Sequence, residues 1–227
     1  SKLFYERFIQ NKEISLFSPH SCPGLYESFG TDKFDELYTR YEADESIPRT
    51  TVGAQELILD LLKERAETGR IYIMNIDHCN SHSSFKDQVH MSNLCQEITL
   101  PTYPLSHIDD HLGEIALCIL SAVNVGKLRD LDELEELCDL SVRGLEELID
   151  YQQYPVIAAE RATKARRSLG IGYIGLAHYL AKQGVKYEDP EAWQLVHDLT
   201  EAFQYYLIKS CLLYTSPSPR DRTRSRM

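Results

Sequence analysis

The sequence predicts an α/β fold, and three observations carry this prediction. The run 115–120, IALCIL, is almost continuously apolar, which suits a strand covered on both faces, as in a parallel sheet. The run 71–76, IYIMNI, has the composition of a second buried strand. Segments with helical periodicity precede the run 71–76 and follow the run 115–120. Strands that alternate with helices indicate an α/β architecture.

The N-terminal part predicts a short opening helix, then the apolar run 14–17 and a breaker-rich loop at 18–24. Aromatic and leucine side chains recur at three- and four-residue steps through 34–41, as on one face of a short helix. A longer helix is expected from position 52 or 53 to 67, and Gly69 is its expected stop signal. Its inward-facing residues are expected to be Leu57, Leu61 and Leu62.

Three more helices are expected in the C-terminal half, at 132–150, 158–182 and 190–208. The first is acidic, with an apolar stripe expected at Leu134, Leu137, Val142, Leu145 and Leu148. The second contains Gly170, Gly172 and Gly175 in a GxGxxG-like spacing. Dinucleotide binding is disfavoured there, because the string follows no predicted strand and the helical stripe continues beyond it.

Composition limits the function classes. The 227 residues suffice for one domain or two small ones, and 43% hydrophobic with 26% charged residues is ordinary for a soluble globular protein. A net charge of -11 argues against a nucleic-acid backbone as partner. No run is long and apolar enough for a membrane span, and the N-terminus lacks signal-peptide features. The six scattered cysteines are typical of reduced thiols, which favours a cytoplasmic location.

One stretch has chemical potential beyond a structural role. In SNLCQEITLP, from Ser92 to Pro101, an extended backbone would place Asn93, Cys95 and Glu97 on one face. That face would offer a carboxamide, a thiol that can hold a radical, and a base. For the pentapeptide alone, the alternative is a half-buried strand whose cysteine is an inert small hydrophobe.

The surrounding strings extend beyond this pentapeptide. SNLCQEITLPT followed by GEIALCILSAVNVG resembles the finger loop and next barrel strand of the large (alpha) subunit of class I ribonucleotide reductases. The resemblance runs from about Leu16 to about Lys209 and includes LFSPHSCPGLY, TGRIYIMNIDHCN, LRDLDELEEL and RRSLGIGYIGLAHYLA. Cobalamin-dependent relatives usually read Asn-Pro-Cys-Gly-Glu in this loop, whereas this chain reads Asn-Leu-Cys-Gln-Glu, which favours class I.

The resemblance implies that residues 1–210 are part of a ten-stranded α/β barrel with its finger loop and packing helices. Residues 211–227 are basic and low in complexity, and they do not resemble the family. We expect this tail to be disordered or to be adaptor or vector sequence. The resemblance further implies a middle fragment of the catalytic subunit, without turnover by itself and prone to aggregation. The parent enzyme would reduce ribonucleoside diphosphates to deoxyribonucleoside diphosphates for DNA precursor synthesis.

The resemblance also implies residue roles. Cys95 would carry the thiyl radical, Glu97 would take the proton of the 3'-hydroxyl, and Asn93 would hydrogen-bond the sugar hydroxyls. Cys118 would be one thiol of the reducing pair. Its partner in the family lies on an earlier strand, and no other cysteine of this chain takes that place. The cysteines expected to be structural are Cys22, Cys79, Cys138 and Cys211.

Implied partners are a small (beta) subunit with a dinuclear metal centre that supplies the radical, thioredoxin or glutaredoxin as reductant, and a second large subunit in a homodimer. ATP and dNTP effectors would bind parts of the family architecture outside this chain, and no cofactor or metal is expected within it. A first alternative is a non-catalytic helical interaction or scaffold module. A second is a metal-dependent hydrolase, although the spacing of His78, Cys79, His82 and His90 matches no structural zinc pattern.

Overall fold

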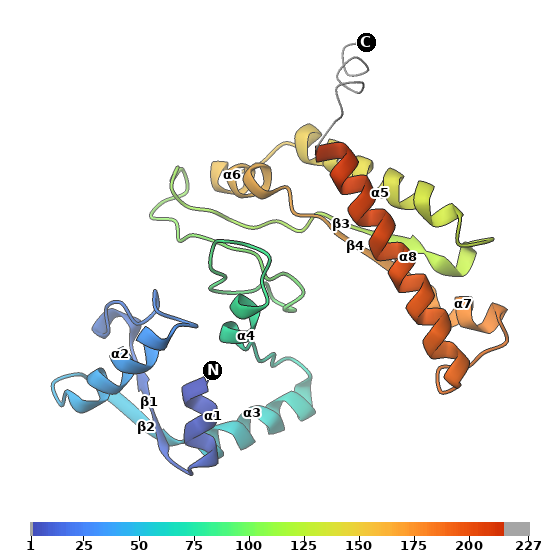
Figure 1. The fold of residues 1–227 in the computed structure, drawn as a ribbon. Coiled ribbons are helices and arrows are strands. Elements are labelled where there is room, and N and C mark those ends of the chain that lie inside the picture. The colour runs from blue at the N-terminus through green and yellow to red at the C-terminus, as the bar shows by residue number, and fades with distance from the viewer. Residues whose placement is uncertain (1, 216–227) are drawn as a thin grey trace. The chain divides into compact units, whose positions relative to one another are not determined.

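The computed structural model describes residues 2–215, and these divide into two compact units that meet in the chain between Pro104 and Leu105 (Figure 1). Each unit contains one pair of strands. The strands of the first pair are antiparallel and those of the second are parallel. The expected α/β class is therefore confirmed, whereas the described residues contain two separate strand pairs and no closed barrel.

The first unit is built around an antiparallel pair. Its elements are α1 (Lys2–Ile9), β1 (Glu13–Phe17), the 3-10 helix η1 (Pro19–Ser21), α2 (Asp32–Ala43), β2 (Arg49–Gly53), α3 (Ala54–Thr68) and α4 (Ile76–Ser81). Ile14 of β1 lies opposite Val52 of β2. The expected helices at the start, at 34–41 and before Gly69 are confirmed. Gly69 ends α3 in the left-handed conformation, with a φ of 67°.

Tyr38 connects α2 to the free edge of β1. Its buried hydroxyl accepts a hydrogen bond from the Ser15 N–H at 2.7 Å and donates one to the Ser15 carbonyl at 2.6 Å. Both backbone groups of Ser15 are thereby satisfied on the side away from β2. Nearby, Arg7 of α1 forms an ion pair with Glu42 of α2. The unit thus fixes its strand edge with side chains instead of a third strand.

The predicted strand at 71–76 is wrong. Residues 71–75 form no regular element, and Ile76 begins α4. Tyr72 and Ile73 are 44% and 45% exposed, so this run is not buried. An extended segment needs a neighbouring strand for its backbone groups, and no strand in the described part of the chain pairs with this one. Leu62, predicted to face inward, is 50% exposed.

The second unit is a parallel βα arrangement. Its elements are β3 (Leu120–Asn124), the 3-10 helix η2 (Val125–Lys127), α5 (Glu133–Tyr151), α6 (Ile157–Arg166), β4 (Gly170–Ile174), α7 (Leu176–Lys182) and α8 (Pro190–Thr215). Leu120 pairs with Gly170, and the register continues to Asn124 and Ile174. Figure 1 shows α5 and α8 running side by side along this strand pair. The sequence predicted a parallel α/β arrangement for the apolar run 115–120, but it did not predict the partner strand β4.

The core of this unit lies between the strand pair and the two long helices. Val123 of β3, Leu134 of α5 and Leu199 of α8 belong to one buried cluster. The stripe predicted for α5 is confirmed at Leu134, Val142 and Leu145, but Leu148 is 44% exposed and Ile149 is fully buried in its place. The buried positions of this helix follow steps of three and four residues.

The single helix predicted at 158–182 is wrong, because α6, β4 and α7 occupy this range. Arg167, at the end of α6, has a left-handed φ of 47°. Glycine disfavours helix, and Gly170 suits β4 because a β-carbon there would lie 2.5 Å from Leu120 Cδ2. Gly175, with a φ of 82°, makes the turn into α7. The GxGxxG-like string is therefore a strand and a turn.

The last helix is longer than expected. It was predicted to end at 208, but α8 continues to Thr215, so position 211 falls inside a helix. The rest of the predicted tail, residues 216–227, lies outside the described residues. In the range that the structure covers, no helix has both the length and the apolar composition that a bilayer crossing requires.

Candidate active site

The loop that carries Cys95 is a tight turn and not an extended strand. The Gln96 N–H donates to the Asn93 carbonyl at 3.2 Å, and Gln96 has a left-handed φ of 62°. The predicted alternation of faces from Asn93 to Glu97 is therefore wrong, since alternation requires extended backbone. A turn forms here because Ser92 and Asn93 offer side-chain oxygens that compete with a strand for the backbone groups.

Two side chains close this loop on Ile98. The Ser92 hydroxyl donates to the Ile98 carbonyl at 2.6 Å, and the Asn93 Oδ1 accepts from the Ile98 N–H at 3.0 Å. The two hydrogen bonds therefore join the start of the loop, at Ser92 and Asn93, to its end at Ile98. Residues 94–97 lie between them. We define Ser92, Asn93 and Ile98 as the loop clamp.

The loop presents its side chains to solvent. Asn93, Cys95 and Glu97 are all exposed, and Leu94 is 88% exposed. The alternative of a buried, inert Cys95 does not describe this structure. The three predicted site residues thus share one exposed loop, and the free Cys95 thiol is accessible to a reactant.

Cys118 lies in the second unit, two residues before β3. The predicted strand 115–120 is displaced, because β3 begins at Leu120 and runs to Asn124. Burial alternates along this segment, with Ile119 and Val123 buried and Leu120 55% exposed. The strand is therefore covered on one face and not on both, contrary to the prediction. Cys118 is exposed and carries a free thiol.

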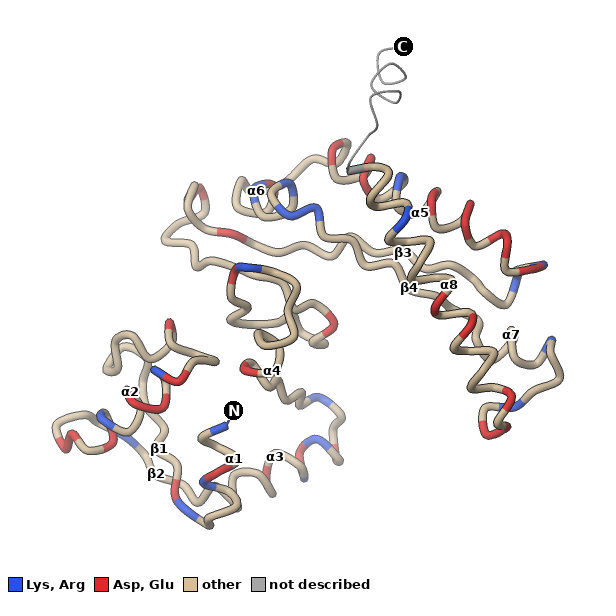
Figure 2. The backbone as a smooth tube through the Cα atoms, viewed as in Figure 1, with Lys and Arg blue, Asp and Glu red and all other residues tan. Residues whose placement is uncertain are grey.

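Charged contacts fix the backbone on the N-terminal side of Cys118. The carboxylate of Glu114 accepts from Arg166 of α6 at 2.6 Å, and the Ile115 N–H donates to the Ala158 carbonyl at 3.2 Å. Figure 2 shows the basic residues of α6 and the acidic residues along α5. Hydrogen bonds from the Ser106 N–H, the Leu112 N–H and the Ser106 hydroxyl hold the pKa of the Asp110 carboxyl below its usual range.

The remaining cysteines differ from these two. Cys138 is fully buried in α5, and burial raises its thiol pKa to about 11. Cys22 is also buried, and burial raises its thiol pKa. Buried thiols with raised pKa values are poor nucleophiles, so the structural role predicted for these two agrees with their surroundings. All six cysteines lie among the described residues, and none of them is in a disulfide.

No group of three or more His, Cys, Asp or Glu side chains within residues 2–215 is arranged to hold a metal ion. His78 and His82 lie on and just after α4, where the His82 Nδ1 contacts the His78 carbonyl at 3.0 Å. This histidine contact belongs to the end of a helical turn, which gives the hydrolase alternative no metal centre in the described part of the chain.

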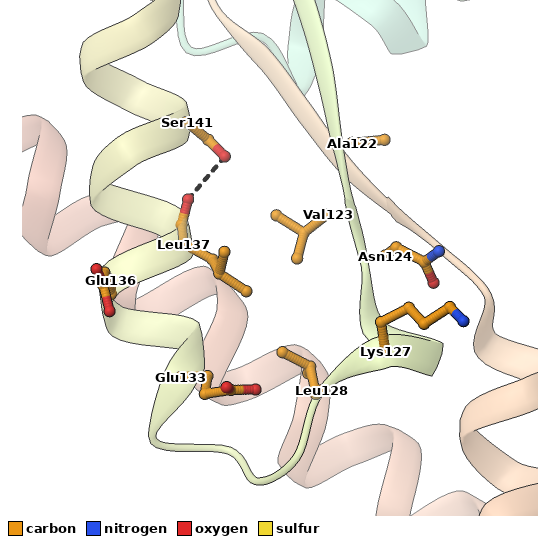
Figure 3. Close-up of a pocket in the computed structure, with 9 residues that line it drawn as sticks. All are labelled: Ala122, Val123, Asn124, Lys127, Leu128, Glu133, Glu136, Leu137 and Ser141. Atoms are coloured by element: carbon orange, nitrogen blue, oxygen red, sulfur yellow. Dashed lines mark hydrogen bonds between the residues drawn. The ribbon is translucent and has the colours of Figure 1, made fainter.

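A pocket of about 430 Å³ opens where β3 ends, between this strand and the first turns of α5 (Figure 3). Val123, Leu128 and Leu137 form its apolar wall, and the polar groups come from Asn124, Lys127, Glu133, Glu136 and Ser141. The Ser141 hydroxyl donates to the Leu137 carbonyl at 2.7 Å. None of the four predicted site residues lines this pocket.

Sequence reasoning missed the clamp. Ser92 was part of the singled-out stretch but received no role, although a Ser-Asn pair at the start of a polar turn is a known signal for side-chain-to-backbone hydrogen bonds. The contact of Glu114 with α6 was also missed, because it joins residues far apart in the sequence.

Comparisons with known proteins identify the family of this chain. The family model "Ribonucleotide reductase, barrel domain" matches residues 1–215. A ribonucleoside-diphosphate reductase subunit alpha from Haemophilus influenzae is 58% identical over 217 residues, covering 93% of this chain and 29% of the relative. The Escherichia coli ribonucleoside-diphosphate reductase 1 subunit alpha is 53% identical over 92% of the chain and 28% of the relative.

A more distant relative, the ribonucleoside-diphosphate reductase subunit alpha of Enterobacteria phage T4, is 43% identical over 92% of the chain and 28% of the relative. The chain thus spans between a quarter and a third of the length of these curated relatives. The family match covers both units, including the Cys95 loop and the strand pair of the second unit. The chain belongs to the ribonucleotide reductase barrel-domain family.

Proposed function

We propose that the chain is part of a catalytic subunit that reduces ribonucleoside diphosphates to deoxyribonucleoside diphosphates by thiyl-radical chemistry. The observation that carries the proposal is the exposed Cys95 thiol, held between Asn93 and Glu97 on a hydrogen-bonded loop within a barrel-domain family match. An inert structural cysteine has no need of exposure at the tip of a loop that its neighbours hold closed.

The first chemical step uses the sulfur of Cys95. Its thiyl radical takes the hydrogen atom from C3' of the ribose, which forms an S–H bond and leaves a carbon radical. S–H and activated C–H bonds have similar strengths, so the hydrogen can return at the end of the cycle. Glu97 accepts the 3'-hydroxyl proton, which weakens the neighbouring C2'–O bond. Asn93 hydrogen-bonds the sugar hydroxyls and holds C3' near the sulfur.

The second step needs two electrons. The 2'-hydroxyl leaves as water, and a pair of thiols supplies two protons and two electrons while forming a disulfide. Glu97 then returns the proton to the 3'-oxygen, and Cys95 returns its hydrogen atom to C3'. We propose that Cys118 is one thiol of this pair, which its exposure and free state support. The net change is one ribonucleoside diphosphate and two thiols to one deoxyribonucleoside diphosphate, one disulfide and water.

The rest of the enzyme follows from the family assignment. We propose a complete ten-stranded barrel in a homodimeric large subunit located in the cytoplasm. The Cys95 radical would be generated by a separate small subunit with a dinuclear metal centre. Thioredoxin or glutaredoxin would reduce the disulfide, and ATP and dNTP effectors would bind outside this segment. The tail boundary near residue 211 stays a prediction.

The test is Cys95→Ser in a complete large subunit that carries this segment, assayed for dCDP formation from CDP with the small subunit and a dithiol. We expect turnover to fall to background while the melting temperature and circular dichroism stay unchanged, because the side chain is exposed. Cys79→Ser, which also lies in the first compact unit, is the matched control and should retain activity in the complete large subunit. Full activity of Cys95→Ser would overturn the proposal and leave the helical scaffold alternative.

A further inference from the structure

The loop clamp provides hydrogen-bond partners for the backbone N–H and carbonyl of Ile98, which have no neighbouring strand to pair with. Residues 92–98 contain no strand or helix, so the N–H and carbonyl of Ile98 need other partners. The Asn93 Oδ1 takes the N–H, and the Ser92 hydroxyl takes the carbonyl. Both backbone groups of one residue are thus bound by two adjacent side chains.

The Ser92 hydroxyl has two possible acceptors, which lie at different distances. Ser92 Oγ lies 2.6 Å from the Ile98 oxygen and 3.3 Å from Asn93 Oδ1. A serine hydroxyl has one hydrogen, and the shorter contact is the better hydrogen bond. Ser92 therefore fixes the C-terminal side of the loop at Ile98, and this contact is independent of what Asn93 does with its amide nitrogen.

We propose that Ser92 is a positioning residue that holds the Cys95 sulfur in its reactive place by closing the loop on Ile98. This inference rests on the proposed function of Cys95. Without the hydroxyl, the Ile98 carbonyl turns to water and the four residues between the clamp sides gain freedom. Displacing a reacting atom by about 1 Å costs about a hundredfold in rate, so a single lost hydrogen bond here acts on turnover more than on stability.

The oxygen and the NH2 group of the Asn93 side chain have different partners, and this difference supports the positioning role of Ser92. Its carboxamide oxygen is bound to the Ile98 N–H, so its NH2 group is the part that can donate to a sugar hydroxyl. The NH2 group of Asn93 keeps this orientation toward the substrate only while the Asn93 oxygen accepts from the Ile98 N–H. Ser92 holds the carbonyl side of the same residue and thereby keeps Ile98 in place for Asn93.

The experiment compares Ser92→Ala, Ser92→Thr and Ser81→Ala in the complete large subunit. Ser81 is the matched control, because its hydroxyl also contacts a backbone carbonyl, that of His78 at 3.1 Å, and it lies outside the loop with a further contact to His82 Nδ1 at 2.9 Å. We expect Ser92→Ala to lower kcat by about tenfold to a hundredfold with KM within about twofold. Ser92→Thr, which keeps the hydroxyl, should restore kcat to within about threefold, and Ser81→Ala should match the parent enzyme.

A second readout is independent of radical chemistry. Hydrogen–deuterium exchange of a peptide covering residues 92–100 should be faster in Ser92→Ala than in the parent enzyme or Ser92→Thr. A parent-like kcat in Ser92→Ala, or an equal loss in Ser92→Thr, would overturn the positioning role. Failure of the proposed function has a different signature, because Cys95→Ser would then remain active whatever the exchange of the loop. Unchanged exchange in Ser92→Ala would also overturn the clamp.

Discussion

Glu114 and Arg166 form a hydrogen-bonded ion pair of 2.6 Å that joins the segment before Cys118 to the end of α6. Their side chains are 7% and 14% exposed, and Arg161 lies 3.7 Å from the other carboxylate oxygen of Glu114. The preceding backbone is held as well, since Arg161 donates to the His111 carbonyl. The path of the chain into β3 is thus set by charged side chains on a helix that follows β3 in the sequence.

We predict that Glu114→Gln destabilises the second unit by about 2 to 4 kcal/mol, because a neutral amide replaces the largely buried carboxylate that pairs with Arg166 and lies near Arg161. Urea unfolding of the chain, followed by far-UV circular dichroism, measures the loss. Asp139→Asn breaks the more exposed pair with Arg143 and should cost less than about 0.5 kcal/mol. Equal losses in the two variants would show that burial of the Glu114 pair has no energetic weight.

Cys118 and Cys138 should respond in opposite ways to serine. In the complete subunit, Cys118→Ser should lower steady-state turnover by more than about a hundredfold, as loss of a reacting group does. Its stability should change by less than about 0.5 kcal/mol, because the side chain is exposed. Cys138→Ser places a hydroxyl in a fully buried site and should cost about 1 to 3 kcal/mol with residual activity in the folded fraction. Turnover assays and thermal melts distinguish the two effects.

The stability of the second unit should fall at alkaline pH through Cys138. Burial raises its thiol pKa from 9.0 to about 11, so the folded state keeps a proton that the unfolded chain loses. The contribution is therefore complete below pH 9 and is lost between about pH 9 and 11, by about 2 to 3 kcal/mol. Cys138→Ala lacks this titration. Urea midpoints measured from pH 8 to 11 should fall less steeply in the variant, and parallel slopes would refute the assignment.

How far the sequence predicts this structure depends on whether the deciding contact is local. Periodicity located α5, because steps of three and four residues from Leu134 to Leu145 are set by the helix itself. The range 158–182 has similar small apolar residues, but β4 forms there because Gly170 lies against Leu120, fifty positions earlier. A strand is completed by its neighbour, and periodicity alone does not show that neighbour.

For the candidate active site, the sequence likewise predicted which residues matter but not the conformation of their backbone. The string around Cys95 identified which residues to examine, and their exposure agrees with a reactive role. Its backbone was predicted as extended because alternating chemistry resembles a strand. The turn depends on where the Ser92 and Asn93 oxygens place their hydrogen bonds, and two conformations of the same residues compete for those bonds.

Gln96 should tolerate glycine and reject a β-branched residue. Its φ of 62° lies in the left-handed region, where glycine is unstrained and β-branched side chains clash with the backbone. The finger loop of the cobalamin-dependent reductases usually has glycine at the corresponding place. We expect Gln96→Gly to keep kcat within about threefold in the complete subunit. Gln96→Val should lower kcat by at least about tenfold, because about 1 to 3 kcal/mol of backbone strain opens the turn that carries Cys95.

The two variants separate backbone conformation from side-chain chemistry at this position. Both remove the Gln96 carboxamide, so a role for that amide in binding would lower activity in each of them. A role for the left-handed turn lowers activity only in Gln96→Val. Steady-state kcat and KM for CDP, with thermal melts as the folding control, give the comparison. Parent-like activity in both variants would mean that the left-handed Gln96 carries no part of the Cys95 geometry, whereas an equal loss in both would assign the effect to the carboxamide.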